Sequence, residues 1–423
     1  MTAKKEKVML LPWIICGLGA VFYCYEYFLR ITPSVMTSEL MSAYHLKGGE
    51  IGNLSAFYYH AYVPMQIVVG LLMDRFGPRR LLTLACVLCA VGTYLFAGKY
   101  GFGMAELGRF LVGFGSAFAF VGALKLATIW LPPNRFALVS GIIMCLGMIG
   151  AMCGDILLRE LVDGLGWRAT IYVSAVVGLG LAIILWSVIR DSDKTHTNQH
   201  IHAINFKTLM AGLAETLGNS QIWLVGSVGF LMYTSLSAFA ELWGIPYLEQ
   251  AHGFSKTTAA YANSIVFLGW AFGSPMWGWI SDSIQRRCLP IIVGGILSLL
   301  FVLILLYVPN LSSFGIYVSL FFFGYFSSVQ ILIFAICHEA SKIKFAGTAI
   351  ALTNMIVMIG GNVFQPIIGK LLDMEWKNVM VNGARVYPTH AYHVALSVLP
   401  LCIVGAIIIM YFVRETNCSV KQH

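Results

Sequence analysis

Charged residues are scarce in this chain of 423 residues, because Asp, Glu, Lys and Arg together make up only 11% of it. Soluble domains carry about 25% charged residues, and a hydrophobic content of 58% is more than a soluble enzyme could bury. Disorder is excluded as well, since a disordered chain combines low hydrophobicity with high net charge. The composition therefore indicates an integral membrane protein.

Short alternating segments are lacking too. The apolar runs continue over roughly 18 residues or more, whereas strands of a membrane β-barrel alternate over about 10. At about 20 apolar residues per span, the chain predicts an all-α membrane protein with twelve transmembrane helices. The expected spans are residues 9–35, 51–72, 81–98, 104–131, 136–158, 168–189, 221–246, 257–280, 289–308, 314–338, 345–370 and 392–414.

Signatures of catalysis and of cofactor binding are also lacking. The ten cysteines form neither a disulfide framework nor a zinc spacing, and no Walker sequence or nucleophile with a paired base is visible. We expect no enzymatic activity, no cofactor, no metal and no nucleic-acid partner. The net charge of +8 is instead a matter of topology, since Lys and Arg gather in the cytoplasmic loops of such proteins.

The positions of the 27 Lys and Arg residues predict the orientation. Most of them fall in segments on the same side as the N-terminus, so both termini should be cytoplasmic. The longest polar stretch, residues 191–220, is expected to be a cytoplasmic linker between two six-helix bundles, residues 1–190 and 221–423. Short loops favour a bacterial inner membrane, and we expect a monomer.

An internal repeat joins the two halves. Gly70 to Arg80 reads GLLMDRFGPRR, and Gly278 to Arg287 reads GWISDSIQRR, so Asp74 recurs as Asp282. Each copy follows the second span of its half. Six-span repeats around a midplane site are typical of one large class of secondary transporters.

The first copy, G-x-x-x-D-R-x-G-x-R-R, resembles the signature loop of the major facilitator superfamily. The motif Arg109-x-x-x-Gly113-x-Gly115 supports the resemblance, which covers essentially the whole chain. It implies two six-helix pseudo-repeats and a loop that latches the cytoplasmic side in the outward-open state. It also places Arg109 where the family has a proton-transfer arginine. The tyrosine-rich first span is similar to that of bacterial nutrient transporters of the phagosomal type. The latch residues would be Asp74, Arg75, Arg79 and Arg80, with Asp282 in a weaker copy.

The first span carries the most informative polar residues. Tyr23, Glu26, Tyr27 and Arg30 follow at i, i+3, i+4 and i+7, which places them on one helical face. Charges within a span are costly and usually mark a solute or proton pathway. We expect Arg30 to pair with a substrate carboxylate, while Glu26 pairs with a substrate amine or carries the coupled proton. The alternative is a local Glu26–Arg30 salt bridge at the outer end of the helix.

Other polar side chains interrupt apolar spans and are further candidates for substrate binding. The tyrosines among them fit interhelical packing as well, and the lysine fits snorkelling to the interface. The glutamate fits an outer gate as well as a partner across the cavity. These candidates are Tyr58, Tyr62, Lys125, Glu241, Asn263, Gln330 and Asn354.

Two pairs of opposite charges lie near the outer ends of the fourth and fifth spans. Glu106 with Arg109, and Asp155 with Arg159, are expected to form ion pairs of an extracellular gate. Together with Glu26 and the latch residues, Arg109 and Asp155 complete the set predicted for proton coupling and gating.

The mixed signs of Glu26, Arg30 and Lys125 favour proton-coupled uptake of a small charged solute such as an amino acid, a peptide or an organic carboxylate. One alternative is a proton-driven exporter of amphipathic compounds. The fifth span argues against it, because it lacks the proline of the antiporter signature. A second alternative is a non-transporting solute receptor that keeps the fold.

Overall fold

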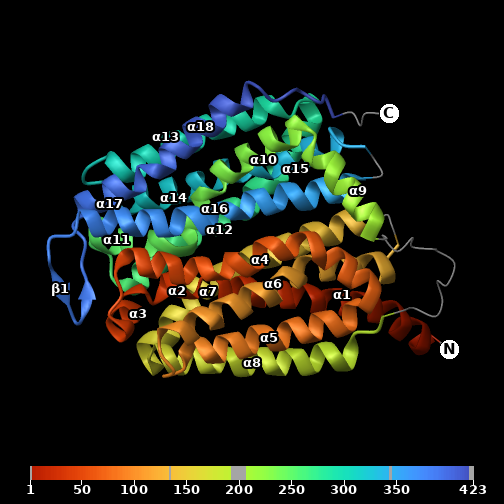
Figure 1. Cartoon of the computed structure of the whole chain (residues 1–423), viewed down its shortest axis with the longest axis horizontal. Helices are drawn as coiled ribbons and strands as arrows, with labels where there is room; N and C mark the ends of the chain where they lie inside the picture. The colour runs from red at the N-terminus through yellow and green to blue at the C-terminus, as the bar shows by residue number, and fades with distance from the viewer. Residues whose placement is uncertain (1, 133–134, 192–205, 343–344, 419–423) are drawn as a thin grey trace.

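The computed structural model describes residues 2–132, 135–191, 206–342 and 345–418, and these are almost entirely helical (Figure 1). Eleven helices or joined helices are long and apolar enough to cross a membrane. The remaining expected span is α12, which is less apolar but has 29 residues. The prediction of an all-α fold with twelve membrane helices is therefore confirmed. The elements that form the spans, alone or joined end to end, are α1 (Thr2–Arg30), α4 (Gly48–Phe76), α5 (Pro78–Ala97), α6 (Phe102–Trp130), α7 (Phe136–Leu165), α8 (Trp167–Val188), α10 (Ser220–Met232), η2 (Ser235–Trp243), α11 (Gly244–His252), α12 (Lys256–Ile284), α13 (Cys288–Tyr307), α14 (Ser313–Ser327), η3 (Ser328–Ile331), α15 (Leu332–Glu339), α16 (Ala346–Met374), α17 (Thr389–Leu396) and α18 (Val398–Met410).

Several short elements lie at the end of the first expected span or in stretches expected to be loops. The helices α2 (Thr32–Val35) and α3 (Thr37–Tyr44) follow α1, and an antiparallel hairpin of β1 (Met380–Val381) and β2 (Ala384–Arg385) precedes α17. Part of the expected linker, residues 192–205, lies outside the described residues. The rest of it includes the helix α9 (Phe206–Leu217), which packs against α16.

The helices form two groups that lie side by side (Figure 1). Helices α1 to α8 make up the first group, and the elements from α10 to α18 make up the second. The groups meet mainly where α4 packs along α16 and α7 packs along α12. Both termini lie at one end of the molecule, which we call the termini end, and the β-hairpin lies at the opposite, hairpin end.

Glycines allow the helices within each group to approach closely. A Cβ atom on Gly113 of α6 would overlap the carbonyl oxygen of Tyr58 in α4. Likewise, a Cβ atom on Gly150 of α7 would overlap the backbone of Cys24, and one on Gly324 of α14 would overlap the backbone of Val266. Small residues have this role in membrane helix pairs, where packing rather than water drives association.

The hairpin end is closed by contacts around Asp373, at the end of α16. Its carboxylate accepts hydrogen bonds from the backbone N–H groups of Gly48 and Gly49, at 2.9 and 2.8 Å, and from the Tyr387 hydroxyl at 2.7 Å. Arg385 of the hairpin donates to the same carboxylate at 3.3 Å. An acid at the first turn of a helix interacts favourably with its dipole, so Asp373 joins α4 of the first group to α16 of the second.

A second set of contacts joins the groups around Glu39 of α3. Its carboxylate lies 2.8 Å from the Lys256 ammonium of α12 and 3.2 Å from the Arg159 guanidinium of α7. Burial by itself raises the pKa of Glu39, but the hydrogen bond and charge of Lys256, with the charge of Arg159, lower it more, so that its pKa lies below the ordinary value. The stabilisation from these pairs is therefore fully present at pH values above the ordinary pKa of a carboxyl group, and it is lost as the pH falls through the lowered pKa of Glu39.

Further toward the termini end, the groups are joined by the hydrogen bond from Asn354 to Gln66 at 2.9 Å. Gln66 is the nineteenth residue of α4, which places it about 27 Å along the helix from Gly48. The hydrogen bonds and ion pairs described between the groups thus lie at the hairpin end and in the centre. At the hairpin end the groups are held together beside a cavity of about 670 Å³, which residues of both groups line, among them Glu39 and Lys256. We refer to this arrangement as closed at the hairpin end.

The substitution Gly113→Ala should destabilise the protein, because the added methyl group must push α4 away from α6. Overpacking of this kind costs about 1 to 3 kcal/mol, which thermal unfolding in detergent would report as a lower melting temperature. Gly17→Ala is the matched control, since nothing lies within 4 Å of a Cβ at that helical position. Equal melting temperatures for the two variants would contradict the proposed close packing.

Candidate functional site

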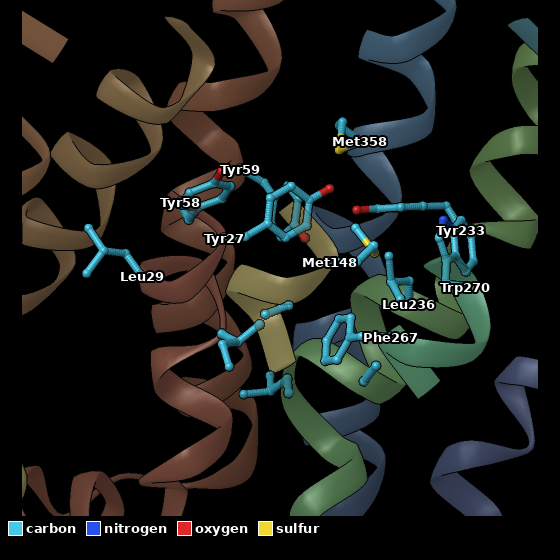
Figure 2. Packing of buried hydrophobic residues seen from close by; sticks show 14 of the residues in the cluster. Tyr27, Leu29, Tyr58, Tyr59, Met148, Tyr233, Leu236, Phe267, Trp270 and Met358 are labelled. Carbon is cyan, nitrogen blue, oxygen red and sulfur yellow. The ribbon is translucent and has the colours of Figure 1, made fainter. Parts of the chain in front are cut away.

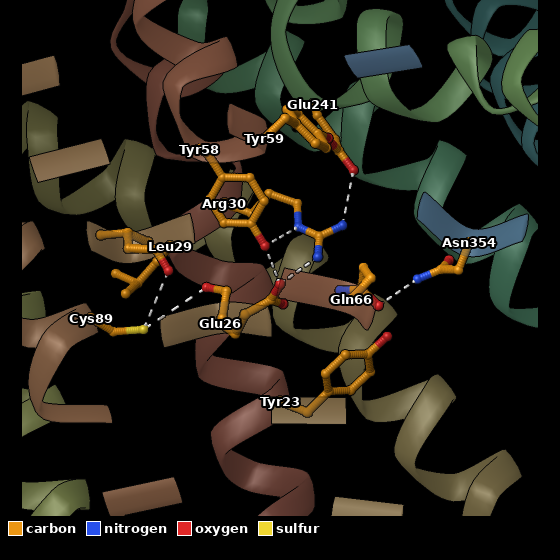
Figure 3. A network of polar contacts seen from close by, with 12 residues as sticks. Tyr23, Glu26, Leu29, Arg30, Tyr58, Tyr59, Gln66, Cys89, Glu241 and Asn354 are labelled. Carbon is orange, nitrogen blue, oxygen red and sulfur yellow. Dashed lines mark hydrogen bonds and ion pairs between the residues drawn. The ribbon is translucent and has the colours of Figure 1, made fainter. Parts of the chain in front are cut away.

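A cluster of buried charges occupies the centre of the molecule, where the two groups meet (Figure 3). Arg30 is the last residue of α1, and α2 begins two residues later at Thr32, with Pro33 in its first turn. A basic residue in the last turn is favoured by the helix dipole. The Arg30 side chain is only 1% exposed, so its charge must be compensated by neighbouring protein groups.

Two carboxylates from different groups compensate Arg30. Glu26, one turn earlier on α1, is in direct contact with the guanidinium, and Glu241 of η2 lies 3.7 Å away. Both acids are at most 1% exposed. The Arg30 guanidinium also donates to the hydroxyls of Tyr58, at 3.1 Å, and Tyr233, at 3.3 Å. One guanidinium therefore links helices of both groups.

Phenol hydroxyls complete the coordination of the two acids. Tyr58 donates to Glu26, Tyr59 donates to Glu241, and Tyr233 donates to Glu241 at 3.2 Å. One oxygen of Glu26, Oε2, has no hydrogen-bond partner in the described part of the chain. Glu241 itself is carried by η2, a π-helical segment. Such segments are rare and often occur at functional sites.

Aromatic rings surround the cluster, and Figure 2 shows Tyr27, Tyr58, Tyr59 and Tyr233 among the buried residues. The guanidinium carbon of Arg30 lies 4.1 Å from the centre of the Tyr27 ring and 5.3 Å from that of Tyr62. Tyr23 packs edge-on against Tyr27 with ring centres 5.1 Å apart, and Tyr62 stacks on Tyr58 at 5.4 Å. These cation–π contacts stabilise the desolvated charge.

Arg109 of α6 takes a different position from the one expected. Its guanidinium donates to the carbonyl oxygens of Leu29 and Arg30, each at 3.0 Å, and so caps the end of α1. It forms no ion pair with Glu106, which accepts a hydrogen bond from Asn53 at 3.3 Å instead. Arg109 thus adds a second positive charge, so the cluster has two arginines and two carboxylates.

The other expected ion pair of the gate does not form either. The Asp155 carboxylate accepts a hydrogen bond at 2.7 Å from Asn263 of α12, in the other group. Arg159 extends toward the hairpin end, where it pairs with Asp163 and Glu39. The i, i+4 spacing of Asp155 and Arg159 permits a pair, but acids near the end of α7 compete successfully for the longer side chain.

Lys125 lies outside the cluster. Its ammonium pairs with Asp74 at 2.6 Å, and its position is sixteen residues beyond Arg109 on α6, about 24 Å along the helix. Its prediction as a substrate ligand is therefore corrected. The same contact keeps Asp74 within one group in this state, since α4 and α6 belong to the same group, and its expected role as a latch of the outward-open state stays a prediction.

The remaining latch residues are likewise engaged within one group. Asp282 pairs with Arg287 at 2.6 Å, and Arg287 also pairs with Glu339 at 2.8 Å. Arg79 donates to the Trp186 carbonyl at 3.0 Å, Arg75 lies over the Phe76 ring and Arg80 is exposed.

Some of the predicted binding residues lie close to Arg30 and others do not. Gln330 is buried in η3 with its amide nitrogen unpartnered among the described residues, while Asn263 and Asn354 make the contacts with Asp155 and Gln66 given above. The sequence prediction missed Tyr59 and Tyr233. Tyr59 lies off the four-residue stripe of Tyr58 and Tyr62, so helical spacing gave no signal for it. The predicted residues that meet at the cluster are Tyr23, Glu26, Tyr27, Arg30, Tyr58, Tyr62 and Glu241.

Comparison with known proteins identifies relatives over most of the chain. The family model of the Major Facilitator Superfamily matches residues 16–365. The probable sulfoacetate transporter SauU of Cupriavidus necator is 25% identical over 379 residues, which are 85% of this chain and 87% of SauU. The probable galactarate/D-glucarate transporter GudP of Escherichia coli is 25% identical over 428 residues, 92% of each chain.

A solved structure shares the fold. It is that of a bacterial homologue of the human lysosomal transporter Spinster in an inward-facing and unoccupied conformation, and it superposes with a TM-score of 0.75 at 15% identity. The alignment covers 95% of each chain. At 15% sequence identity, the similarity between the two structures shows that they share a fold.

Replacing Tyr59 by Phe should destabilise the closed state, because Glu241 Oε2 loses its described donor while it stays buried. Leaving a buried acceptor unsatisfied costs about 1 to 3 kcal/mol. Thermal unfolding of Tyr59→Phe beside Tyr411→Phe would measure the effect, since Tyr411 is 73% exposed. Identical melting temperatures would show that the Tyr59 hydroxyl contributes nothing to the cluster.

Proposed function

Because the chain belongs to the major facilitator superfamily and is a membrane transporter rather than an enzyme, we propose that it takes up a small organic anion together with protons. The observation that supports this proposal is the buried Arg30 guanidinium held between Glu26 of one group and Glu241 of the other. Charged side chains inside a membrane protein mark solute and ion pathways.

The anion would bind by replacing one of the two acids on Arg30. A carboxylate forms two parallel hydrogen bonds with a guanidinium, which makes it a strong and geometrically specific partner. Glu26 and Glu241 already balance Arg30 and Arg109, so an added anion leaves the cluster with an uncompensated negative charge. Protonation of Glu26 removes that charge and frees the guanidinium. Anion and proton would therefore bind together.

The same exchange would couple binding to movement of the two groups. Arg30 and Glu241 belong to different groups, and their contact is part of the state that is closed at the hairpin end. A solute that takes the place of Glu241 removes this link. The groups then separate at one end or the other around the central site, as in transporters that work by rocking of two repeats.

The relatives support a carboxylate as the solute class. Sulfoacetate, galactarate and D-glucarate, the compounds in the names of two relatives, are all small carboxylates. A carboxylate is also complementary to the Arg30 guanidinium, which Glu26 and Glu241 neutralise in the described state. An amphipathic compound would instead need an apolar cavity, and the cluster around Arg30 is polar at its centre.

For the membrane arrangement, we propose a monomer in a bacterial inner membrane with the termini end in the cytoplasm. The excess of Lys and Arg in the segments on this side supports the orientation. The hairpin end, with Asp373 and Glu39, would then face outward, and the described state would be closed to the outside.

Carboxylate binding should depend on Arg30. Purified protein should be stabilised against heat by D-glucarate or sulfoacetate and not by glucose, because only the folded state binds the ligand. Arg30→Gln should bind about 10- to 100-fold more weakly, since a hydrogen-bonded charge is lost. Arg414→Gln, at an exposed position near the C-terminus, is the control. Stabilisation by lipophilic cations alone, equal in all variants, would favour the exporter.

Proton coupling should depend on Glu26. In proteoliposomes, a pH gradient that is acidic outside should drive accumulation of the labelled carboxylate by the wild-type protein. Glu26→Gln, which is neutral at every pH, should still exchange the carboxylate across the membrane but should lose gradient-driven accumulation. If Glu26→Gln accumulates the solute as the wild type does, the proton binds elsewhere. Binding without any flux in the wild type would favour a receptor.

A further inference from the structure

A second buried carboxyl, that of Asp155 in α7, lies outside the cluster around Arg30. Asp155 is 0% exposed, and its Oδ2 atom accepts a hydrogen bond from the Asn263 amide of α12. Its Oδ1 atom has no hydrogen-bond partner in the described part of the chain. No Lys or Arg of the described residues pairs with Asp155, which distinguishes it from Glu26 and Glu241.

The charged groups on the elements around Asp155 are engaged with other partners. The side chains that face its carboxyl are the neutral Ser34 of α2 and Asn263, and the Ser34 hydroxyl makes no hydrogen bond of ordinary geometry. An ionised carboxylate here would be buried without a counter-charge, which is strongly unfavourable. The charged groups on α1, α6, α7, α8, α12 and η2 that have partners elsewhere are Glu26, Arg30, Glu106, Arg109, Lys125, Arg159, Glu160, Asp163, Arg168, Glu241, Lys256 and Asp282.

The hydrogen bonds of Asn263 indicate which cation neutralises the carboxyl. Its Nδ2 atom donates to Asp155 at 2.7 Å and to the Ala240 carbonyl at 2.8 Å, so both of its N–H bonds are used and its orientation is fixed. An N–H group therefore occupies Oδ2, where a metal ion would need an oxygen-lined space. Oδ1 remains, with the Ser34 hydroxyl as an acceptor beside it. A proton on Oδ1 fits this arrangement because it neutralises the carboxyl without displacing the Asn263 amide, and sodium is the alternative that the experiment distinguishes.

We propose that Asp155 is a proton-binding site of the α7–α12 interface and that the two groups close at the hairpin end only when this carboxyl is protonated. On opening, α7 and α12 separate, water reaches the carboxyl, and the O–H bond breaks to give a carboxylate and a proton released to the solvent on that side. Asp155 is thus a second proton site beside Glu26. Its place in solute uptake rests on the proposed function, whereas its effect on closure does not.

Proton linkage makes the proposal quantitative. If the closed state holds one more proton than the open state, the ratio of closed to open molecules falls by up to tenfold for each pH unit above the ordinary carboxyl range. The Glu39 pairs, at the same end, have the opposite sign, because they weaken only as the pH falls through the lowered pKa of Glu39. The two effects are therefore separable by their direction.

The test uses the full-length protein in lipid nanodiscs without added solute. Hydrogen–deuterium exchange, corrected for the intrinsic effect of pH, is measured between pH 6 and pH 9 for residues 155–163 of α7 and 256–263 of α12. In the wild type, the open fraction reported by these segments should increase by up to tenfold per pH unit. In Asp155→Asn, which cannot ionise, the segments should stay protected throughout. Glu215→Gln, at a side chain of α9 that is 38% exposed and lies away from the hairpin end, should behave as the wild type does.

An infrared measurement keeps the test independent of how well the variants fold. The wild type at pH 6 should show the carbonyl band of a buried protonated carboxyl, which should be absent from Asp155→Asn and present in Glu26→Gln. A wild type whose exchange is independent of pH would overturn the proposal. So would recovery of protection at pH 9 by sodium chloride but not by choline chloride, because that result assigns the site to sodium.

The outcomes separate this inference from the proposed function. A pH-dependent closure lost in Asp155→Asn supports the inference even if no carboxylate is bound or transported. Carboxylate uptake that depends on Arg30, together with identical exchange in the wild type and Asp155→Asn, supports the function and overturns the inference.

Discussion

The structure depends on one constraint, which is that a guanidinium buried between membrane helices must be neutralised by the protein around it. Arg30 is 1% exposed, and the cost of an uncompensated ion at such a depth is several kcal/mol or more. Glu26 on the same helix supplies one negative charge. The second positive charge, on Arg109, is balanced only because Glu241 reaches the cluster from the other group. Neutrality at the centre therefore requires the two groups to be together.

The contacts between the groups include polar pairs that can be exchanged for water, which suits motion of whole groups. Within a group, helices meet through glycines such as Gly113, with backbones too close to slide or part without loss of packing. Between the groups, α4 and α16 also meet through glycines near the hairpin end, where Cβ atoms on Gly52 and Gly369 would overlap the backbones of Gln365 and Gly48. Polar contacts such as that of Asn354 with Gln66 join the groups further along. Water can replace each partner of these polar contacts when the groups separate. The groups can therefore move as units while the contacts between them are exchanged.

The sequence predicted the spans and half of the site because both leave a local signal. Long apolar runs mark helices, and the spacing of Glu26 and Arg30 places them on one face whatever the tertiary structure. The position of Glu241 inside a span marks it as a candidate, but its contact with Arg30 leaves no local signal, since the two residues are more than 200 positions apart. The hairpin and α9 lie in polar stretches, where hydropathy carries no information about structure. Their positions follow from contacts with α3 and α16.

The incorrect expectations have a common physical cause. A charge inside a span indicates a polar environment but not a depth, so Lys125 was grouped with Arg30 although its partner Asp74 lies at the termini end. Likewise, i, i+4 spacing permits a pair between Asp155 and Arg159 but does not exclude better partners. Arg159 is long enough to reach Glu39, which left Asp155 without a cation. Both outcomes were decided by tertiary neighbours.

The charge balance of the cluster also limits what it can carry. With two arginines and two carboxylates, the cluster is neutral in the described state. A solute that bears one negative charge leaves the cluster neutral only if one proton binds with it. A solute with two negative charges requires two protons, and the cluster has two carboxylates, Glu26 and Glu241, that can accept them. Asp155 cannot serve in this balance, because it is not paired with either arginine. In the proposed mechanism, the number of protons that accompany the solute would therefore be set at Arg30, whereas Asp155 would set the condition under which the groups close.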